Sequence, residues 1–215
     1  MNYPCCSHFF LGANTPEGFY SLYNQLHNTD SMLYILKGGP GCGKSSFMKR
    51  TAKAAESCGH RVKYVHCSGD PDSLDAIIIP TLGISLADGT APHILEPVYP
   101  AVSEMYIDLS HCYDSRSIRS HLRSIVMLNA AYKTKYDSAY RLLAAVGKLG
   151  HDLRDSFTDE KLTEKLHRRG CGIISRELPR KKCTQPGVMS SCFISSVTCK
   201  GYCSFVRPPL SCRVY

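Results

Sequence analysis

Short apolar runs separated by turn residues fill the first half of the chain, and they predict strands. The run 31–37 (SMLYILK) has the length of a strand, and 61–68 (RVKYVHCS) alternates apolar with polar or small positions. Between them, 45–59 (SSFMKRTAKAAESCG) has helical spacing and a terminal glycine. The order strand, helix, strand predicts a βαβ unit whose two strands are parallel.

Two more apolar runs, 76–80 and 83–89, follow the turn-rich segment 69–75 (GDPDSLD). From Ser115 onward the pattern changes, because apolar residues now recur every three or four positions. The pattern indicates helices over 115–169, which we expect to form a helical hairpin packed on the first domain. A coiled coil that binds a protein partner is the alternative interpretation.

Within this helical region, Gly147 and Gly150 are the residues at which we expect a long helix to break. The segment 158–169 (TDEKLTEKLHRR) predicts a further, polar helix with acidic residues in its first turn. Beyond it, 170–189 has no sustained periodicity and has the composition of a basic linker. We therefore expect an irregular C-terminal tail.

The tail also contains an internal repeat. Residues 190–206 (SSCFISSVTCKGYCSFV) align without a gap to 7–23 (SHFFLGANTPEGFYSLY), with five identities and a shared T-x-x-G core. The second copy stops where the first would enter its strand at 31–37. We expect 190–215 to be the start of a truncated second repeat.

Composition narrows the class of protein. Of the 215 residues, 43% are hydrophobic and 20% charged, which is typical of a globular domain rather than a disordered chain. No run approaches the length of a membrane span and no export leader is present, so we expect a cytoplasmic protein without membrane contact. None of the twelve cysteines forms a C-x-x-C pair, which disfavours zinc knuckles and a secreted disulfide framework.

The net charge of +8 is concentrated after residue 170 and is balanced before it. Basic residues with few aromatic neighbours are more typical of a solvated linker than of a nucleic-acid surface. Nucleic acid is therefore an unlikely partner, although salt-dependent binding through the basic segment RELPRKK at 176–182 is a further hypothesis.

The main chemical signal is a glycine-rich loop that fits G-x-x-x-x-G-K-[ST]. Several glycines together let backbone N–H groups approach phosphate oxygens, and the following helix directs its unpaired N–H groups at the same place. Lys44 is expected to reach the β and γ phosphates, and the Ser45 hydroxyl to bind Mg²⁺. The predicted nucleotide-binding residues are Gly38, Gly39, Pro40, Gly41, Cys42, Gly43, Lys44, Ser45 and Ser46.

A magnesium site of this kind also needs an acid, normally at the end of another buried strand. Asp88 is the best candidate, and Lys44 and Asp88 are the predicted catalytic residues; the alternative is that Asp88 only caps a turn before Gly89. Because Gly89 follows instead of Glu, a general base, if the reaction uses one, must come from elsewhere. The candidates are Asp70, Asp72, His66, His93 and Glu96.

With these motifs in view, the chain resembles a family of uncharacterised bacterial P-loop ATP-binding proteins that carry two similar NTPase halves. The resemblance rests on HFFLGANTPEGF (8–19), YILKGGPGCGKSS (34–46), HCSGDPDSLD (66–75) and DGTAPH (88–93). It implies cytoplasmic ATP binding and an α/β fold with a P-loop NTPase-type parallel sheet and flanking helices. The implied units are a P-loop core (1–114), the helical hairpin (115–169), the linker (170–189) and the second repeat (190–215).

Two classes of function follow from these expectations. The first is an enzyme, an ATPase or a nucleotide kinase-like phosphotransferase, that binds Mg-ATP and transfers the γ-phosphate to water or to a small acceptor. The missing acid after Asp88 mildly favours a small acceptor. The alternative is a nucleotide-dependent interaction module with little or no turnover, which uses the nucleoside triphosphate to set the position of helices 115–169 against a protein partner.

Overall fold

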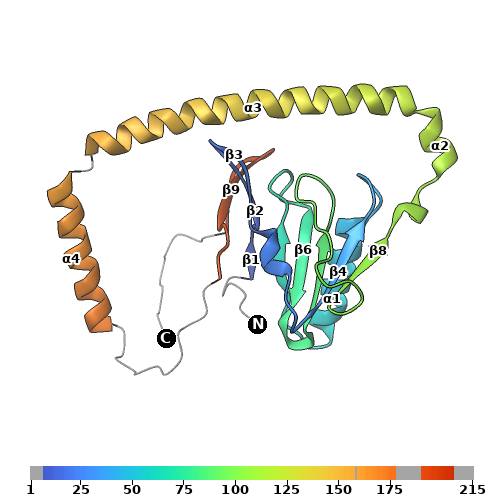
Figure 1. Ribbon diagram of the computed structural model, residues 1–215, viewed down its shortest axis with the longest axis horizontal. Coiled ribbons are helices and arrows are strands. Elements are labelled where there is room, and N and C mark those ends of the chain that lie inside the picture. The colour runs from blue at the N-terminus through green and yellow to red at the C-terminus, as the bar shows by residue number, and fades with distance from the viewer. Residues whose placement is uncertain (1–6, 158, 178–189, 206–215) are drawn as a thin grey trace.

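The chain folds as an α/β protein around a six-stranded mixed sheet (Figure 1). The computed structural model describes residues 7–157, 159–177 and 190–205. The strands lie in the order β1-β5-β6-β7-β4-β8. Their bounds are β1 His8–Phe9, β4 Met32–Lys37, β5 Lys63–His66, β6 Leu74–Ile79, β7 Ile84–Asp88 and β8 Glu104–Asp108.

The expected all-parallel sheet is wrong at one strand. β4 is parallel to its neighbours β7 and β8, and β1 is parallel to β5, but β6 is antiparallel to both β5 and β7. The reason is the length of the connections. Only a short 3₁₀ turn, η2 (Pro80–Leu82), and Gly83 in the left-handed region join β6 to β7, which permits a hairpin but not a crossover.

The predicted βαβ unit is present in a wider form. Helix α1 (Lys44–Ser57) connects β4 to β5, and the two strands point the same way, as expected. They are not neighbours, however, because β6 and β7 lie between them. All six residues of β6 are buried, which explains why this strand lies inside the sheet.

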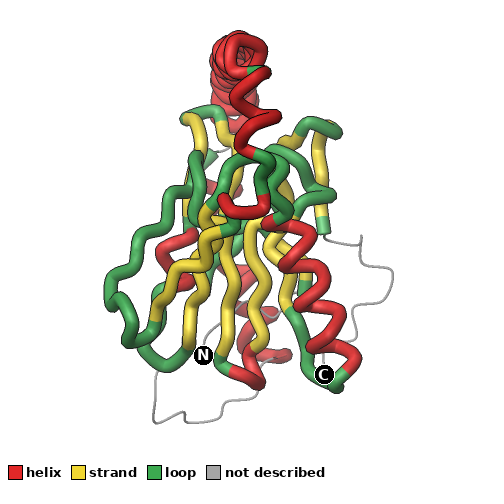
Figure 2. Tube along the Cα trace, turned by 90° about the vertical axis from the view of Figure 1, so that its right-hand side faces the viewer, coloured by secondary structure: helices red, strands yellow, loops and turns green. Residues whose placement is uncertain are grey.

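The two faces of the sheet are covered by different kinds of structure (Figure 2). On one face α1 packs Met48 and Ala52 against Ile77 and Leu86. The other core cluster joins Tyr23 and further residues of the N-terminal segment to the sheet, including Phe9, Leu11, Leu26, Ile35, Ile78 and Leu95. That segment contains the hairpin β2 (Gly12–Thr15) and β3 (Gly18–Ser21) and the 3₁₀ helix η1 (Tyr23–Leu26). Only one of the two covering layers is therefore an α-helix.

After β8, a 3₁₀ turn (η3, Ser110–Cys112) leads into α2 (Ser115–Ser120) and then α3 (Leu122–Phe157). Asp114 begins α2, because its carboxylate accepts hydrogen bonds from the backbone N–H groups of the first turn. The expected break at Gly147 or Gly150 is wrong, since α3 continues through both. In the part of the chain that is described, no helix is both long and apolar enough to cross a membrane.

The expected helical hairpin is also wrong. Helix α4 (Glu160–Glu177) confirms the predicted polar helix and extends it into the expected linker, but Figure 1 shows it turning away from α3 instead of folding back along it. Helix α3 contacts the rest of the chain mainly at β2, where Tyr140 hydrogen-bonds Asn14. Gly147 of the same helix lies against Pro16, the residue after β2. Residues 178–189, the remainder of the expected linker, lie outside the described residues.

The predicted repeat forms the same local structure as its first copy, so the tail is not irregular over 190–205. Strands β9 (Ser195–Thr198) and β10 (Gly201–Ser204) make an antiparallel hairpin like β2–β3. In both turns the threonine hydroxyl donates to the glycine carbonyl, Thr15 to Gly18 at 2.8 Å and Thr198 to Gly201 at 2.9 Å. Residues 206–215, where the second copy was expected to stop, lie outside the described residues.

The two copies also pair with each other. Phe10 and Phe193, which are equivalent positions of the repeat, exchange backbone hydrogen bonds of 2.8 Å and 2.9 Å. The second hairpin therefore packs beside β2 and adds no strand to the main sheet (Figure 1).

Candidate functional site

The glycine loop connects the end of β4 to the start of α1, as its spacing predicts. Gly41 and Gly43 have φ angles of 81° and 93°, which side chains with a Cβ rarely adopt. At Gly38 an added Cβ would lie 2.6 Å from the Cys42 Sγ, so this position also requires glycine. The N-cap residue Gly43 supplies no side-chain hydrogen bond, so the first N–H groups of α1 remain available to a ligand.

Lys44 is the centre of this loop. Its side chain is only 9% exposed, and its Nζ donates to the carbonyl oxygens of Gly38 (2.6 Å) and Gly39 (3.0 Å). The same Nζ lies 3.5 Å from Asp88 Oδ2. A buried ammonium group is thus held between loop carbonyls and one carboxylate, at the N-terminus of α1.

Asp88 makes the contacts of a turn acid and also faces the glycine loop. Its Oδ1 accepts hydrogen bonds from the Thr90 N–H (2.9 Å) and hydroxyl (2.5 Å), as a turn acid does. Its Oδ2 faces Lys44, because β7 pairs with β4 in a register that places Asp88 opposite Leu36, just before the loop. Ser45 accepts a 3.0 Å hydrogen bond from the Leu74 N–H, which ties α1 to the start of β6.

The outer residues of the predicted set lie around this centre. Pro40, Gly41 and Ser46 are exposed, whereas Cys42 is buried under the loop. Tyr113, which the sequence did not indicate, donates its hydroxyl to Pro40 O at 2.7 Å. Tyr113 follows β8 and lies across the glycine loop. Because it is far from the loop along the chain, only the folded structure shows this contact.

Four of the five candidate bases are engaged elsewhere. Asp70 accepts from Ser73 within its own turn, and Asp72 forms an ion pair with Lys200 that holds the pKa of its carboxyl below the ordinary value. Their neighbour His66 lies between His8 and Pro71 O. Glu96 accepts from Lys37 at 2.8 Å and from Tyr106, and these contacts lower its pKa.

The fifth candidate, His93, lies beside Asp88 together with a residue that the sequence did not single out, Asp75. The three side chains each offer one ligand atom, and these atoms lie within 4.8 Å of one another. His93 Nε2 is 3.8 Å from Asp75 Oδ1. Asp75 ends the acidic segment DPDSLD and directly precedes an apolar run, which is the only signal for it in the sequence.

Asp75 is an unusual carboxyl group because it is 4% exposed. Burial raises its pKa, and this effect outweighs the lowering by His93 and by the Tyr23 hydroxyl, which donates to Oδ2 at 2.7 Å. Tyr23 also stacks on the His93 ring, with 4.2 Å between ring centroids. The tyrosine therefore fixes both partners.

The loop that carries His93 is anchored on both sides. Lys37, at the end of β4, donates to Gly89 O and Leu95 O, each at 2.9 Å. Glu104, at the start of β8, accepts from the N–H groups of Val98 and Tyr99. The segment between β7 and β8 is therefore held at two places: Lys37 anchors it beside the glycine loop, and Glu104 anchors it at the opposite end of the sheet, where β4 and β8 begin.

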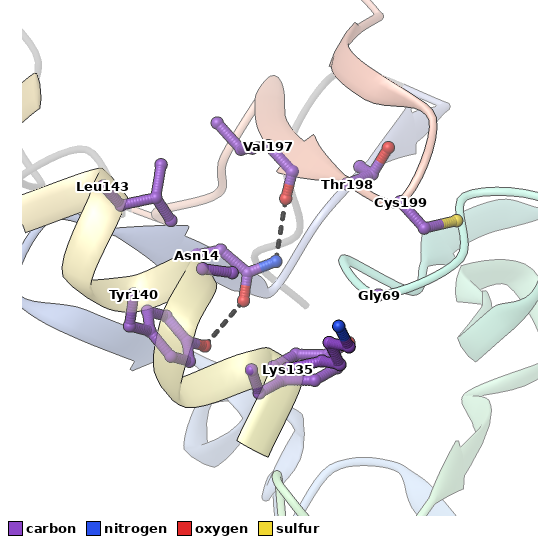
Figure 3. Close-up of a pocket in the computed structure, with 10 residues that line it drawn as sticks. Asn14, Gly69, Lys135, Tyr140, Leu143, Val197, Thr198 and Cys199 are labelled. Carbon is purple, nitrogen blue, oxygen red and sulfur yellow. Dashed lines mark hydrogen bonds between the residues drawn. The ribbon is translucent and has the colours of Figure 1, made fainter. Parts of the chain in front are cut away.

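A separate hollow lies between α3 and the two hairpins, where Tyr140 donates its hydroxyl to Asn14 Oδ1 at 2.7 Å (Figure 3). The Asn14 amide nitrogen in turn donates to Val197 O (2.7 Å) and Ser68 O (3.1 Å). Leu143 adds an apolar wall. Because the polar groups of Asn14 are already paired, we interpret this hollow as the joint that seats α3 and the second hairpin.

Comparisons with protein-family models, with curated proteins and with solved structures found no significant match to this chain.

Proposed function

We propose that this protein binds Mg-ATP at the glycine loop and transfers its γ-phosphate to water or to a small acceptor. The observation that supports this best is the buried Lys44 ammonium, held by loop carbonyls at the uncapped start of α1. A triphosphate would replace the carbonyl partners of Lys44 with anionic oxygens. It would also accept from the free N–H groups of α1.

The remaining roles follow from position. Ser45 would bind Mg²⁺ through its hydroxyl, and Asp88 would hold the same ion from the end of β7. Asp88 is paired with Lys44, so nucleotide entry would draw the lysine toward the phosphates and free the carboxylate. The absence of an acid directly after Asp88 favours an acceptor other than water, as the sequence suggests.

Binding is tested by calorimetry with Mg-ATP and with a non-hydrolysable analogue. Lys44→Ala should weaken nucleotide binding at least about tenfold, because each lost charge-assisted hydrogen bond is worth about 1.5–3 kcal/mol. The matched control is Lys49→Ala, since Lys49 lies on the same helix but is exposed and donates to Asp72 O. Equal affinity of both variants would contradict the proposal.

Turnover is tested with labelled ATP, with and without a panel of nucleosides and nucleotides. Phosphate release in the absence of an acceptor would assign an ATPase, whereas label in an acceptor would assign a phosphotransferase. Asp88→Asn should retain nucleotide binding and lose most of the turnover, because it removes the charge that would hold the metal but keeps the Lys44 ammonium and the loop N–H groups that would hold the phosphates.

A nucleotide-dependent interaction module is the second candidate, and α3 favours it. Large apolar side chains along this helix are exposed, among them Leu142, Val146, Leu149 and Leu153. Under this proposal, ATP-dependent capture of a protein partner would persist in Asp88→Asn without turnover. Loss of capture together with turnover would favour the enzyme.

A further inference from the structure

We propose that Asp75, Asp88 and His93 form a binding site for one divalent first-row transition-metal ion, distinct from the magnesium that would accompany ATP. The site needs no nucleotide and therefore goes beyond the proposed function. It lies where β6 and β7 meet at the edge of the sheet that carries the glycine loop.

The geometry is close to that of a bound ion. The three candidate ligand atoms lie within 4.8 Å of one another. With metal–ligand distances of about 2.0–2.2 Å, two ligands of one ion are at most about 4.4 Å apart. A closure of a few tenths of an ångström, within the reach of side-chain rotation, would bring all three into coordination.

His93 provides the independent observation that points to a ligand. The residue is 6% exposed, and neither of its ring nitrogens has a hydrogen-bond partner. Buried polar groups are nearly always paired, because an unpaired one costs about 1–3 kcal/mol. Its Nε2 is directed at Asp75 Oδ1 but stops at 3.8 Å, too far for a hydrogen bond. An ion between the two groups would satisfy both.

The surroundings fix the ligands as outer-shell residues of metal sites do. Tyr23 stacks on the His93 ring and donates to Asp75 Oδ2, and the Cys67 thiol also hydrogen-bonds the Asp75 carboxyl, so both candidate ligands are held in place. Thr90 holds Asp88 Oδ1 in the same way. A cation would also offset the cost of burying the Asp75 carboxylate, which Lys44 does not contact.

The donor set indicates the class of metal. Two carboxylates and one imidazole suit Mn²⁺, Fe²⁺ or Zn²⁺ better than Ca²⁺, which takes six to eight oxygen ligands, or soft ions such as Cu⁺. Three protein ligands leave positions open for water or for a phosphate oxygen. Asp88 is common to this site and to the proposed magnesium site, so the two ions would be neighbours.

The test uses the metal-stripped full chain without nucleotide and Mn²⁺ as the probe, because thiols bind this ion weakly and the chain has twelve cysteines. Loss of the free-ion electron paramagnetic resonance signal reports binding. We expect one Mn²⁺ per chain, and at least about tenfold weaker binding in His93→Gln and in Asp75→Asn. The matched controls, His66→Gln and Asp72→Asn, should bind as the wild type does.

A second measurement on the wild type keeps the test valid if a variant fails to fold. Pulsed electron paramagnetic resonance of bound Mn²⁺ should show coupling to one imidazole nitrogen. Absence of that coupling, absence of binding, or equal affinity in folded His93→Gln and Asp75→Asn would overturn the proposal. ATP binding is measured separately, so a failure of the nucleotide proposal leaves this result intact.

Discussion

Glu104 provides the sharpest test of how the loop between β7 and β8 is held. The residue is 1% exposed, and its carboxylate accepts hydrogen bonds from the backbone N–H groups of Val98 and Tyr99. His27 Nδ1 lies 2.5 Å from Oε1 and provides the third donor. Burial alone would raise the pKa of Glu104, but these three donors hold it below its ordinary value of 4.5.

Removing this carboxylate leaves three part-buried donors without their acceptor. Each hydrogen bond lost to a charged acceptor is worth about 1.5–3 kcal/mol, and the partial exposure of the donors keeps the sum low, so Glu104→Ala should lower the free energy of unfolding by about 3–5 kcal/mol. For a chain of this size, 1 kcal/mol corresponds to about 2–4 °C in Tm, which predicts a fall of about 6–20 °C. Glu104→Gln keeps one acceptor and should cost about 1–3 kcal/mol.

The assay is urea and thermal unfolding followed by circular dichroism. The control is Glu96→Gln, whose side chain is 64% exposed and should change stability by less than about 1 kcal/mol. Because the folded-state pKa of Glu104 is lowered, its contribution is present above pH 4.5 and is lost as the pH falls through the folded pKa. The gap between wild type and Glu104→Gln should therefore close in acid. A Glu104→Ala protein within about 1 kcal/mol of the wild type would show that this carboxylate does not anchor the loop.

Three further predictions concern helix α3 and the thiols. Gly150→Ala should stabilise α3 by about 0.5–1 kcal/mol, because an added Cβ there meets nothing. Gly147→Ala should lose that gain and raise amide exchange in α3, since its Cβ would lie 2.4 Å from Pro16 Cβ; equal effects would contradict this contact. Asn14→Ala should cost about 1–3 kcal/mol and speed proteolysis around α3 and β9, as a protease time course would show. Burial raises the pKa of Cys67 to about 12, so mass spectrometry at pH 8 should find this thiol alkylated after the exposed cysteines. Because the unfolded thiol ionises near pH 9 and the folded one does not, the free energy of unfolding should fall as the pH rises past 9.

Elements with local geometry could be predicted from the sequence. The glycine loop lies between a strand and a helix because left-handed glycines and the start of α1 are set within a few residues. The repeat could also be predicted, because in both copies a threonine hydrogen-bonds the glycine three positions later, and both residues are visible in the sequence. Helix α4 follows from its periodicity, although its end at Glu177 did not.

Which side chains come into contact depends on the arrangement of the strands in space. Asp75 faces Asp88 and His93 only because β6 turns back antiparallel to β7, in the register that pairs Ala76 with Ala87. A strand pattern has the same alternation in either direction, so the sequence could not show that reversal. The burial of Glu104 likewise depends on groups from three separate segments. Such contacts join residues distant along the chain, and no local spacing encodes them.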